Sequence, residues 1–226
     1  MLASAVKVFS NGQNFLRLLE GLWMTLKLSA AAVSLSLFFG FIVGLLMLSS
    51  RKTVRTSTRF YLETIRIVPV LTFLFLFYYL LSRTFKINLE SVTVVLLTFT
   101  LWGTAEIADL VRGAFTSIPR HQKESGLAVG LTDLQVQLHI IAPQAARRLA
   151  PGVVNLVTRM IKTTSLVFFI GIPELVTVSQ QVVEVAAYQH NRPAAFWIYG
   201  LVFLFYFIVC WPISKISKSL EKRCLY

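Results

Sequence analysis

Charged residues are scarce in this sequence, and acidic residues are the scarcest of them. Asp and Glu number ten against 22 Lys and Arg, and these four types make up only 14% of the 226 residues. Hydrophobic residues make up 56%, and the mean hydropathy is +0.70. A soluble domain of this size is rarely more than half apolar. The composition therefore excludes an ordinary soluble domain and predicts that most of the chain faces lipid or other membrane helices.

Cysteine and histidine are also rare, which argues against disulfide and metal chemistry. Cys210 and Cys224 form neither a disulfide framework nor a CxxC pair. The three histidines share no metal-ligand spacing, so we predict no bound metal ion. No G-x-S-x-G or H-E-x-x-H motif occurs, which argues against a membrane enzyme. No G-x-x-x-x-G-K-[ST] phosphate loop occurs either, so the chain does not hydrolyse ATP on its own.

The net charge of +12 does not indicate a nucleic-acid partner. A polynucleotide groove needs a basic face interleaved with aromatic residues, and the sequence shows none. Lys and Arg instead cluster in the gaps between apolar runs, on alternate sides of those runs. That distribution is typical of proteins whose basic loops set their orientation in a membrane.

Five apolar runs are long enough to cross a bilayer as helices. They occupy residues 22–49, 60–81, 91–114, 149–172 and 194–213. Residues 1–21 are mildly amphipathic and are predicted to be an external lead-in, because the run that follows is too long for a cleaved signal peptide. Residues 214–226 form a basic tail. The sequence thus predicts an all-α integral membrane protein with a five-span core over residues 22–213.

Counting Lys and Arg by loop predicts the orientation of these spans. The loops at 50–59 and 115–147 carry four and three, and the C-terminal tail carries four. The two loops on the other side carry two and one. Because cytoplasmic loops are enriched in Lys and Arg, we expect the N-terminus outside and the C-terminus in the cytoplasm. The longest polar segment, residues 115–147, is then cytoplasmic.

This cytoplasmic segment is predicted to hold two short helices. Ser117 and Pro119 mark the start of the first, since proline is tolerated where the first N–H groups lack partners. Gly130 breaks it. A second amphipathic piece follows and is predicted to end at Pro143. A helix, a glycine break and a second helix between two spans are suited to docking a partner at the membrane face.

The spacing of this segment resembles a motif of the permease subunits of binding-protein-dependent ABC importers. That motif reads Glu-Ala-Ala, three residues, Gly, nine residues, then Ile-x-Leu-Pro. The matching positions here are Glu124, Gly130, Ile140 and Pro143, with Ser125 and Gly126 in place of the alanines and Ala142 in place of the leucine. The replacements stay small, so close packing of the helix is retained.

Other segments resemble the polar amino-acid branch of these permeases. They are residues 61–66 with Pro69, 104–107 with Arg112 and Gly113, 143–148, 162–166 and 171–175. In 162–166 the branch has Lys-Asp-Thr-Ser-Leu, whereas this chain has Thr163 in place of the acid. The resemblance covers about residues 21–215, and the order and spacing of the motifs carry it.

The resemblance implies the type I ABC importer permease fold, with five spans and a cytoplasmic coupling helix, in the inner membrane of a bacterium. It implies a second permease copy or paralogue, two ATPase subunits that hydrolyse ATP with Mg, and an external binding protein. The chain itself would bind no cofactor. Which amino acid is transported, and whether the permease pairs with itself or with a paralogue, stay open.

In such permeases the coupling helix fits a groove on the ATPase. Residues 119–130 form this helix here, and the residues implied in coupling are Pro119, Glu124, Ser125, Gly126, Gly130 and Pro143. Glu124 is the natural charged contact to the ATPase. The alternative is that Glu124 only pairs with Arg120, one turn earlier on a solvated helix.

Charged residues inside spans are costly and are functional candidates by default. We hypothesise that the substrate path is lined by Glu63, Arg66, Glu106, Lys162, Thr163, Thr164 and Ser165. Glu106 suits the ammonium of an amino acid, and Lys162 suits its carboxylate. As alternatives, Glu63 and Arg66 neutralise each other, or all these groups join helices by hydrogen bonds. By depth in the membrane, Arg66 can reach Glu106, whereas a direct Glu106–Lys162 pair is less favoured.

An ion-coupled secondary amino-acid carrier is the main alternative function. Such carriers usually have more spans, arranged as internal repeats with broken helices. Five spans without a visible repeat argue against it. Co-purification with an ATPase subunit would distinguish the two functions.

Overall fold

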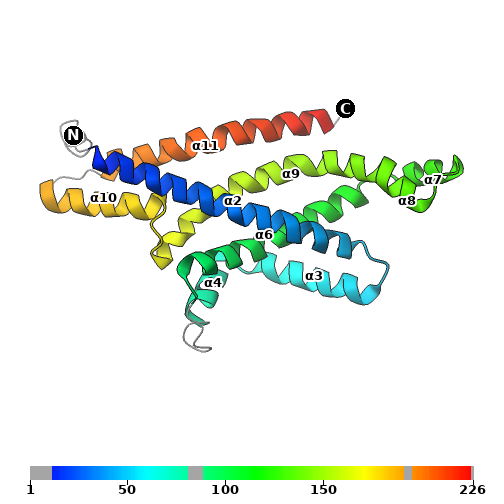
Figure 1. The fold of residues 1–226 in the computed structure, drawn as a ribbon, viewed down its shortest axis with the longest axis horizontal. Coiled ribbons are helices and arrows are strands. Elements are labelled where there is room, and N and C mark those ends of the chain that lie inside the picture. The colour runs from blue at the N-terminus through cyan, green and yellow to red at the C-terminus, as the bar shows by residue number, and fades with distance from the viewer. Residues whose placement is uncertain (1–11, 81–88, 191–194, 225–226) are drawn as a thin grey trace.

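The computed structural model describes residues 12–80, 89–190 and 195–224, and these residues are helical almost throughout (Figure 1). Within these ranges there is no β-strand. The elements are α2 (Gln13–Met47), α3 (Lys52–Ile67), α4 (Val70–Phe75), η1 (Leu76–Leu80), α6 (Ser91–Thr116), α7 (Arg120–Ala128), α8 (Asp133–Val136), η2 (Gln137–Ile141), α9 (Ala142–Thr163), η3 (Thr164–Ile170), α10 (Leu175–His190) and α11 (Ala195–Cys224). The all-α prediction is confirmed.

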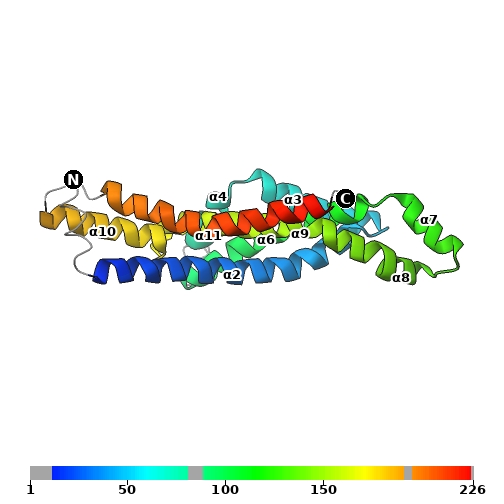
Figure 2. The same ribbon diagram turned by 90° about the horizontal axis from the view of Figure 1, so that it is seen from above.

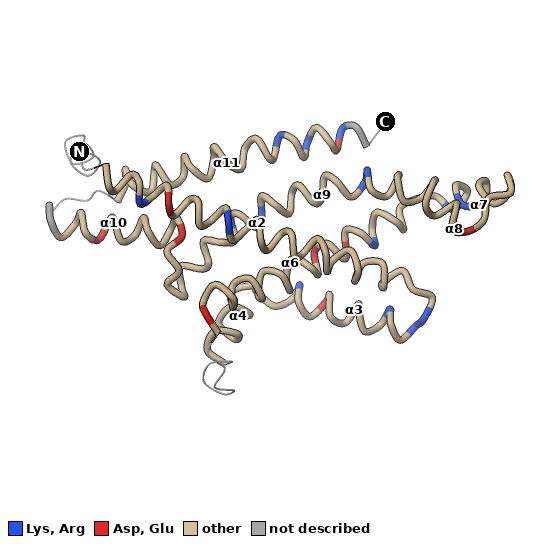
Figure 3. The backbone as a smooth tube through the Cα atoms, viewed as in Figure 1, with Lys and Arg blue, Asp and Glu red and all other residues tan. Residues whose placement is uncertain are grey.

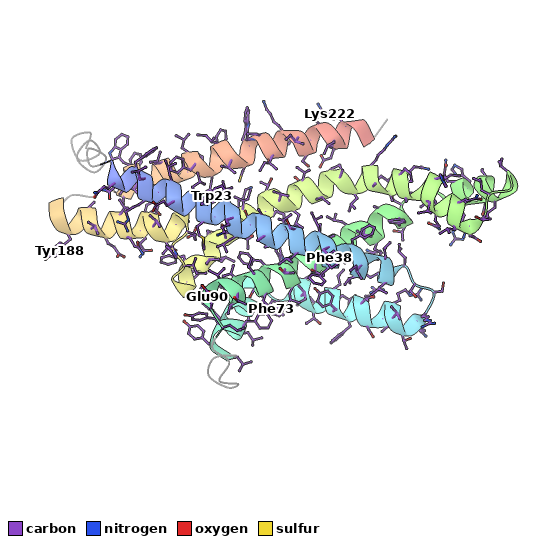
Figure 4. All side chains as sticks on the ribbon, in the orientation of Figure 1. Trp23, Phe38, Phe73, Glu90, Tyr188 and Lys222 are labelled. Atoms are coloured by element: carbon purple, nitrogen blue, oxygen red, sulfur yellow. The ribbon has the colours of Figure 1, made fainter. Side chains whose placement is uncertain are left out.

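Four stretches of the described chain are long and apolar enough to cross a membrane. They are Gln13–Met47, Ser91–Thr116, Asp133–Ile170 and Ala195–Lys222. They correspond to the first, third, fourth and fifth predicted spans. Exposed apolar side chains cover them: on α2, Trp23 is 69% exposed and Phe38 62% exposed (Figure 4). Transfer of apolar side chains out of water is favourable, so this surface is suited to contact with lipid.

The second span departs from the prediction of one helix over residues 60–81. A 16-residue helix, α3, ends at Ile67, and α4 with η1 leaves it at an angle of 98°. Pro69 is the cause, because it has no N–H to donate and forces the preceding residue out of the helical region. Val68 accordingly has extended angles, φ −83° and ψ 131°. Among the residues that the structure describes, four long helical stretches and one bent pair take the place of five straight spans.

The predicted ends of the first and last spans also differ from the helix ends. α2 begins at Gln13, so the described part of the lead-in, residues 12–21, is mostly one helix with the first span. Its Leu18 is fully buried. α11 continues to Cys224, through most of the predicted tail. Residues 1–11, and the loop lysine and arginines counted at 83, 86 and 192, lie outside the described residues.

Helix α2 packs along α6, and two glycines of α2 make this close contact possible. A Cβ atom at Gly40 would lie 2.5 Å from Ile107 Cβ, and one at Gly44 would lie 2.6 Å from Val111 Cβ. The carbonyl oxygen of Thr104 lies 3.0 Å from the first of these positions. The Gly-x-x-x-Gly spacing therefore lets the two backbones approach closely, as small residues do in membrane helices.

The segment between the fourth and fifth spans is more ordered than a polar stretch of residues 173–193 would suggest. A 16-residue helix, α10, occupies most of it and buries a stripe of Val178, Val182 and Ala186 against α2 and α11. Glu174 caps its start: Thr177 N donates to Glu174 Oε1 at 2.9 Å. A side chain that accepts from the first turn stabilises a helix start, and this cap is what extends the helix.

Candidate functional site

The segment after α6 projects beyond the ends of the long helices. Figures 1 and 2 both show α7 and α8 at one extreme of the molecule, past the ends of α2 and α11. Pro119 precedes α7 as its cap residue, with φ −62° and ψ 140°. The predicted helix start and the predicted coupling position are therefore at the tip of the molecule.

Gly130 ends α7 in a closed turn. Its φ of +89° lies in the left-handed region that favours glycine. The Gly130 N–H donates to the Leu127 carbonyl at 3.0 Å, and the Leu131 N–H donates to the Gly126 carbonyl at 3.2 Å. These two bonds form a Schellman cap, which satisfies carbonyls at the end of a helix. The predicted glycine break is confirmed, and it fixes the direction in which the chain leaves α7.

Gly126 allows α7 to lie directly on the following helix. A Cβ atom there would come within 2.8 Å of both Ile140 Cδ1 and Val136 Cγ2. An ion pair between Lys123 Nζ and Asp133 Oδ1, at 2.7 Å, joins the same two elements. The small size of Gly126 is therefore needed for packing against Val136 and Ile140 within the segment, whether or not a partner also contacts it.

Pro143 does not end the second helix, contrary to the prediction. α8 continues through a π-helical turn, η2, into α9, where Pro143 lies in the first turn. Pro143 has no N–H to donate, and it follows directly on the π-helical turn, where the Ala142 N–H donates to the Gln137 carbonyl. One 38-residue helical stretch thus runs from Asp133 to Ile170.

The surface of this segment is exposed and partly apolar. Glu124, Ser125 and Pro143 are all exposed, and the described residues contain no ion pair between Glu124 and Arg120. Apolar side chains beside them are exposed too: Val129 by 82%, Leu134 by 68%, Leu138 by 58% and Leu127 by 41%. Of these, Leu127 and Val129 lie outside the candidate membrane-crossing stretches, and an exposed apolar surface there indicates a protein contact.

Inside the spans, Glu106 pairs with Arg159 and not with Arg66 or Lys162. Arg159 Nη1 lies 3.0 Å from Glu106 Oε2, joining α9 to α6. The Glu106 side chain is 14% exposed and that of Arg159 is 52% exposed. The Arg159 guanidinium also lies over the Trp102 ring, 5.1 Å from its centroid. The predicted approach of Arg66 to Glu106 is wrong.

Lys162 lies one turn beyond Arg159 on α9 and is exposed. Its ammonium forms no salt bridge with any described residue. The neighbouring hydroxyls are already engaged with backbone: Thr163 with the Arg159 carbonyl at 2.8 Å, Thr164 with that of Ile161 at 2.7 Å and Ser165 with that of Lys162 at 2.8 Å. Thr164 is fully buried. Lys162 is therefore the group of this stretch that is most open to a ligand.

Glu63 and Arg66 do not neutralise each other. Glu63 Oε1 pairs with Arg59 Nε at 2.8 Å, while Arg66 Nη1 pairs with Asp109 Oδ2 at 2.6 Å. Arg112 Nη2 contacts the other oxygen of Asp109, also at 2.6 Å. Glu63 and Arg66 line one cavity beside α3. Neither Glu106 nor Lys162 lines that cavity. The predicted substrate-path residues thus form two separate groups.

Sequence reasoning missed Arg159 and Asp109, although both are charged residues within predicted spans. The rule that such residues are functional candidates applies to them as it does to Glu106 and Lys162. Arg159 precedes Lys162 by three positions, so the two share a helix face. The three-residue spacing from Lys162 could therefore have identified Arg159 from the sequence.

Glu174 was also missed as a site of interest. Its side chain is fully buried, and Thr25 Oγ1 of α2 donates to its Oε2 at 3.3 Å. The same hydroxyl accepts from Leu175 N at 3.3 Å. Burial raises the pKa of the Glu174 carboxyl, because the charged form loses its water. The group holds α10 to α2 between the fourth and fifth spans.

Most of the chain is similar in sequence to known membrane transport proteins. Residues 36–220 match the family model described as binding-protein-dependent transport system inner membrane component. A probable glutamine ABC transporter permease protein of Bacillus subtilis strain 168 is 30% identical, over 90% of this chain and 92% of its own length. A glutamine transport system permease protein of Escherichia coli K12 is also 30% identical, over 91% and 92%.

Two solved structures resemble this one in fold. The crystal structure of an amino acid ABC transporter with histidines superposes with a TM-score of 0.84 and 26% identity, covering 95% of this chain and 97% of that one. The methionine ABC transporter in an inward-facing conformation gives a TM-score of 0.74 at 18% identity, over 93% and 97%. The second likeness concerns the arrangement of the helices alone.

Proposed function

The chain belongs to the family of binding-protein-dependent transport system inner membrane components, and on that basis we propose that it passes a polar amino acid from an external binding protein into the cytoplasm. It is a permease subunit of an ABC importer, a multi-pass protein whose helices cross the inner membrane. The amino-acid substrate is supported by the names of its relatives, which are permeases for glutamine, glutamate and cystine.

The proposed assembly contains two ATPase subunits, a second copy or a paralogue of this chain, and the external binding protein. ATP and Mg are handled by the ATPase subunits, and this chain has no catalytic activity of its own. The C-terminus and the segment 115–147 lie in the cytoplasm, and the N-terminus lies outside. The Lys and Arg counts of the loops support this orientation.

The observation that carries the coupling role is the exposed apolar tip of a rigid segment. α7 is held on both sides by the Gly130 cap and by the packing of Gly126, so its orientation is fixed by its own chain. Glu124 and Val129 lie exposed on it, at the tip of the molecule. A rigid helix loses little conformational freedom on docking, and burying an exposed valine contributes roughly 1.5–3 kcal/mol.

Val129→Asp is expected to lower capture of the ATPase subunit by about tenfold, because a charge would replace an apolar contact in the interface. The measurement is co-purification of the ATPase subunit with tagged permease at matched expression. Tyr188→Asp is the matched control, since Tyr188 is 94% exposed at the opposite end of the molecule on α10 (Figure 4). Equal capture by both variants would refute docking on α7, and uptake that persists without ATP would favour an ion-coupled carrier.

The substrate path is proposed to pass Glu106 and Lys162. Glu106 faces Arg159 across α6 and α9, and Lys162, one turn further along α9, forms no salt bridge with any residue that the structure describes. A carboxylate and an unpaired ammonium supply complementary contacts for a zwitterion. Thr163, Thr164 and Ser165 are also proposed to contribute to the path. Their hydroxyls donate to backbone carbonyls at the end of α9, and this helix end positions Lys162. Glu63 and Arg66, which the sequence also predicted to line the path, lie in the separate cavity described above, so the proposed path does not include them.

Glu106→Gln and Lys162→Met are each expected to lower uptake by about tenfold, because a charge-assisted hydrogen bond to the substrate would be lost. Uptake of labelled amino acid and substrate-stimulated ATPase activity of the reconstituted importer are the measurements. Lys215→Met is a matched control, since Lys215 lies on α11 with its ammonium 3.8 Å from the centroid of the Trp211 ring. Wild-type uptake and stimulation in both variants would exclude these residues from the path.

A further inference from the structure

The cavity lined by Glu63 and Arg66 has a volume of about 580 Å³ and opens between the C-terminal end of α2, the length of α3 and the last turns of α6. Four arginines line it: Arg55, Arg59, Arg66 and Arg112. Three of their side chains are well exposed, by 73% for Arg59, 44% for Arg66 and 43% for Arg112. The guanidinium groups therefore line a space that a ligand can enter.

The cavity has an excess of positive charge. Its lining includes two carboxylates, Glu63 and Asp109, against the four arginines, which leaves a formal charge of +2. Asp109 is shared by two of the arginines, and Glu63 is paired with Arg59. Arg55 is exposed and forms no salt bridge among the residues that the structure describes. A guanidinium has five N–H donors in a planar fork, so each retains donors for an anion such as a phosphate.

One wall of the cavity is apolar and continues into the lipid-facing surface. Met47, Leu48 and Leu62 line it beside the arginines. Leu48 is 37% exposed, and the exposed Leu45 and Leu46 precede it on α2. The cavity therefore lies where an apolar helix ends and a basic turn begins. A ligand that fits this border has an apolar part and an anionic head.

We propose that this cavity binds an anionic phospholipid, with its phosphate among the arginines and its acyl chains along the exposed leucines of α2. Basic pockets between membrane helices on the cytoplasmic side are suited to such head groups. The turn that bounds the cavity lies at the same end of the molecule as α7 (Figure 1), and basic residues follow from that turn along α3 (Figure 3). The site is separate from Glu106 and Lys162 and does not rest on the proposed substrate.

The test is native mass spectrometry of the full chain in detergent, titrated with dioleoyl-phosphatidylglycerol or with dioleoyl-phosphatidylcholine. The Arg55→Gln, Arg59→Gln double variant is expected to bind phosphatidylglycerol about tenfold more weakly and phosphatidylcholine unchanged. The matched control is Lys218→Gln, Lys222→Gln, which removes the same charge from exposed lysines at the end of α11 (Figures 3 and 4). It is expected to change affinity less than twofold.

Three results would overturn the proposal. Equal weakening in the lysine control would mean general attraction to the basic end of the protein. Displacement of phosphatidylglycerol by millimolar inorganic phosphate would mean a site for the free anion. Displacement by the transported amino acid would mean that Arg66 and Glu63 belong to the substrate path. If the double variant does not purify, Arg55→Gln alone decides, with an expected loss of about threefold, since Arg55 has no salt-bridge partner in the described chain to lose.

Discussion

The double variant Gly40→Leu, Gly44→Leu is expected to separate α2 from α6 and to lower the free energy of unfolding by about 3 kcal/mol or more. The first atom of a side chain at Gly44 would already lie 2.6 Å from Val111 Cβ and 3.0 Å from the Ala108 carbonyl oxygen. Neither contact is with the end of a flexible side chain. The helices must therefore move apart, and the buried contacts along the seam are lost together.

The measurement is the folded fraction of the detergent-solubilised chain during titration with a denaturing detergent. Gly200→Leu is the matched control, because a Cβ atom at Gly200 on α11 meets nothing within 4 Å. It adds the same side chain to the same kind of membrane helix. Unchanged stability in the double variant would show that α2 and α6 do not pack in this way.

Glu174→Ala is expected to cost about 3 kcal/mol of stability, through loss of the α10 cap and of the hydrogen bonds to α2. The change leaves Thr177 N without its side-chain acceptor and leaves the Thr25 hydroxyl without the carboxylate that it contacts at 3.3 Å. Both groups are buried, so water does not replace the lost partner. We expect α10 to detach from α2 before the rest of the chain unfolds.

Hydrogen exchange of α10 amides, read by mass spectrometry, is the measurement for Glu174→Ala. Glu184→Ala is the control on the same helix, since Glu184 is exposed and is bonded only by Gln180, at 3.0 Å, among the described residues. Its effect should stay within about 0.5 kcal/mol, as for other surface substitutions. Protection of α10 that is equal in both variants would contradict an anchoring role for Glu174.

The sequence determined which runs are helical but not how two of its prolines act. At Pro69 the preceding residue is extended and the helix turns by 98°. At Pro143 the helix continues, with a π-helical turn before it. A proline in both places removes one N–H, and the outcome depends on whether neighbouring elements hold the helix together. Ile141 and Ala145 are buried in a cluster with Val136, which supplies that support at the second site.

The candidate site was predictable to a similar degree. The helix start at Pro119 and the break at Gly130 were predictable from local signals, because the cap, the glycine and their spacing all lie within one stretch of sequence. The partner of Glu106 was not, since depth in the membrane favoured Arg66 over Lys162, whereas the structure pairs Glu106 with Arg159. The rotation of α3, α6 and α9 about their own axes decides which one meets it, and tertiary packing sets that rotation. Pairs within one helix, such as Arg59 with Glu63, need no such knowledge.

The helical stretch from Asp133 to Ile170 forms one rod that begins beside α7, the proposed docking helix, and carries Arg159 of the charged pair. At 1.5 Å per residue, Arg159 lies about 39 Å along this rod from Asp133. A tilt of about 5° about the first end would then displace the second by roughly 3.5 Å. That distance exceeds the length of the Glu106–Arg159 contact, which is 3.0 Å. Under the proposed docking, a small tilt passed from α7 to this rod is therefore enough to separate Arg159 from Glu106, with no change in the helix itself.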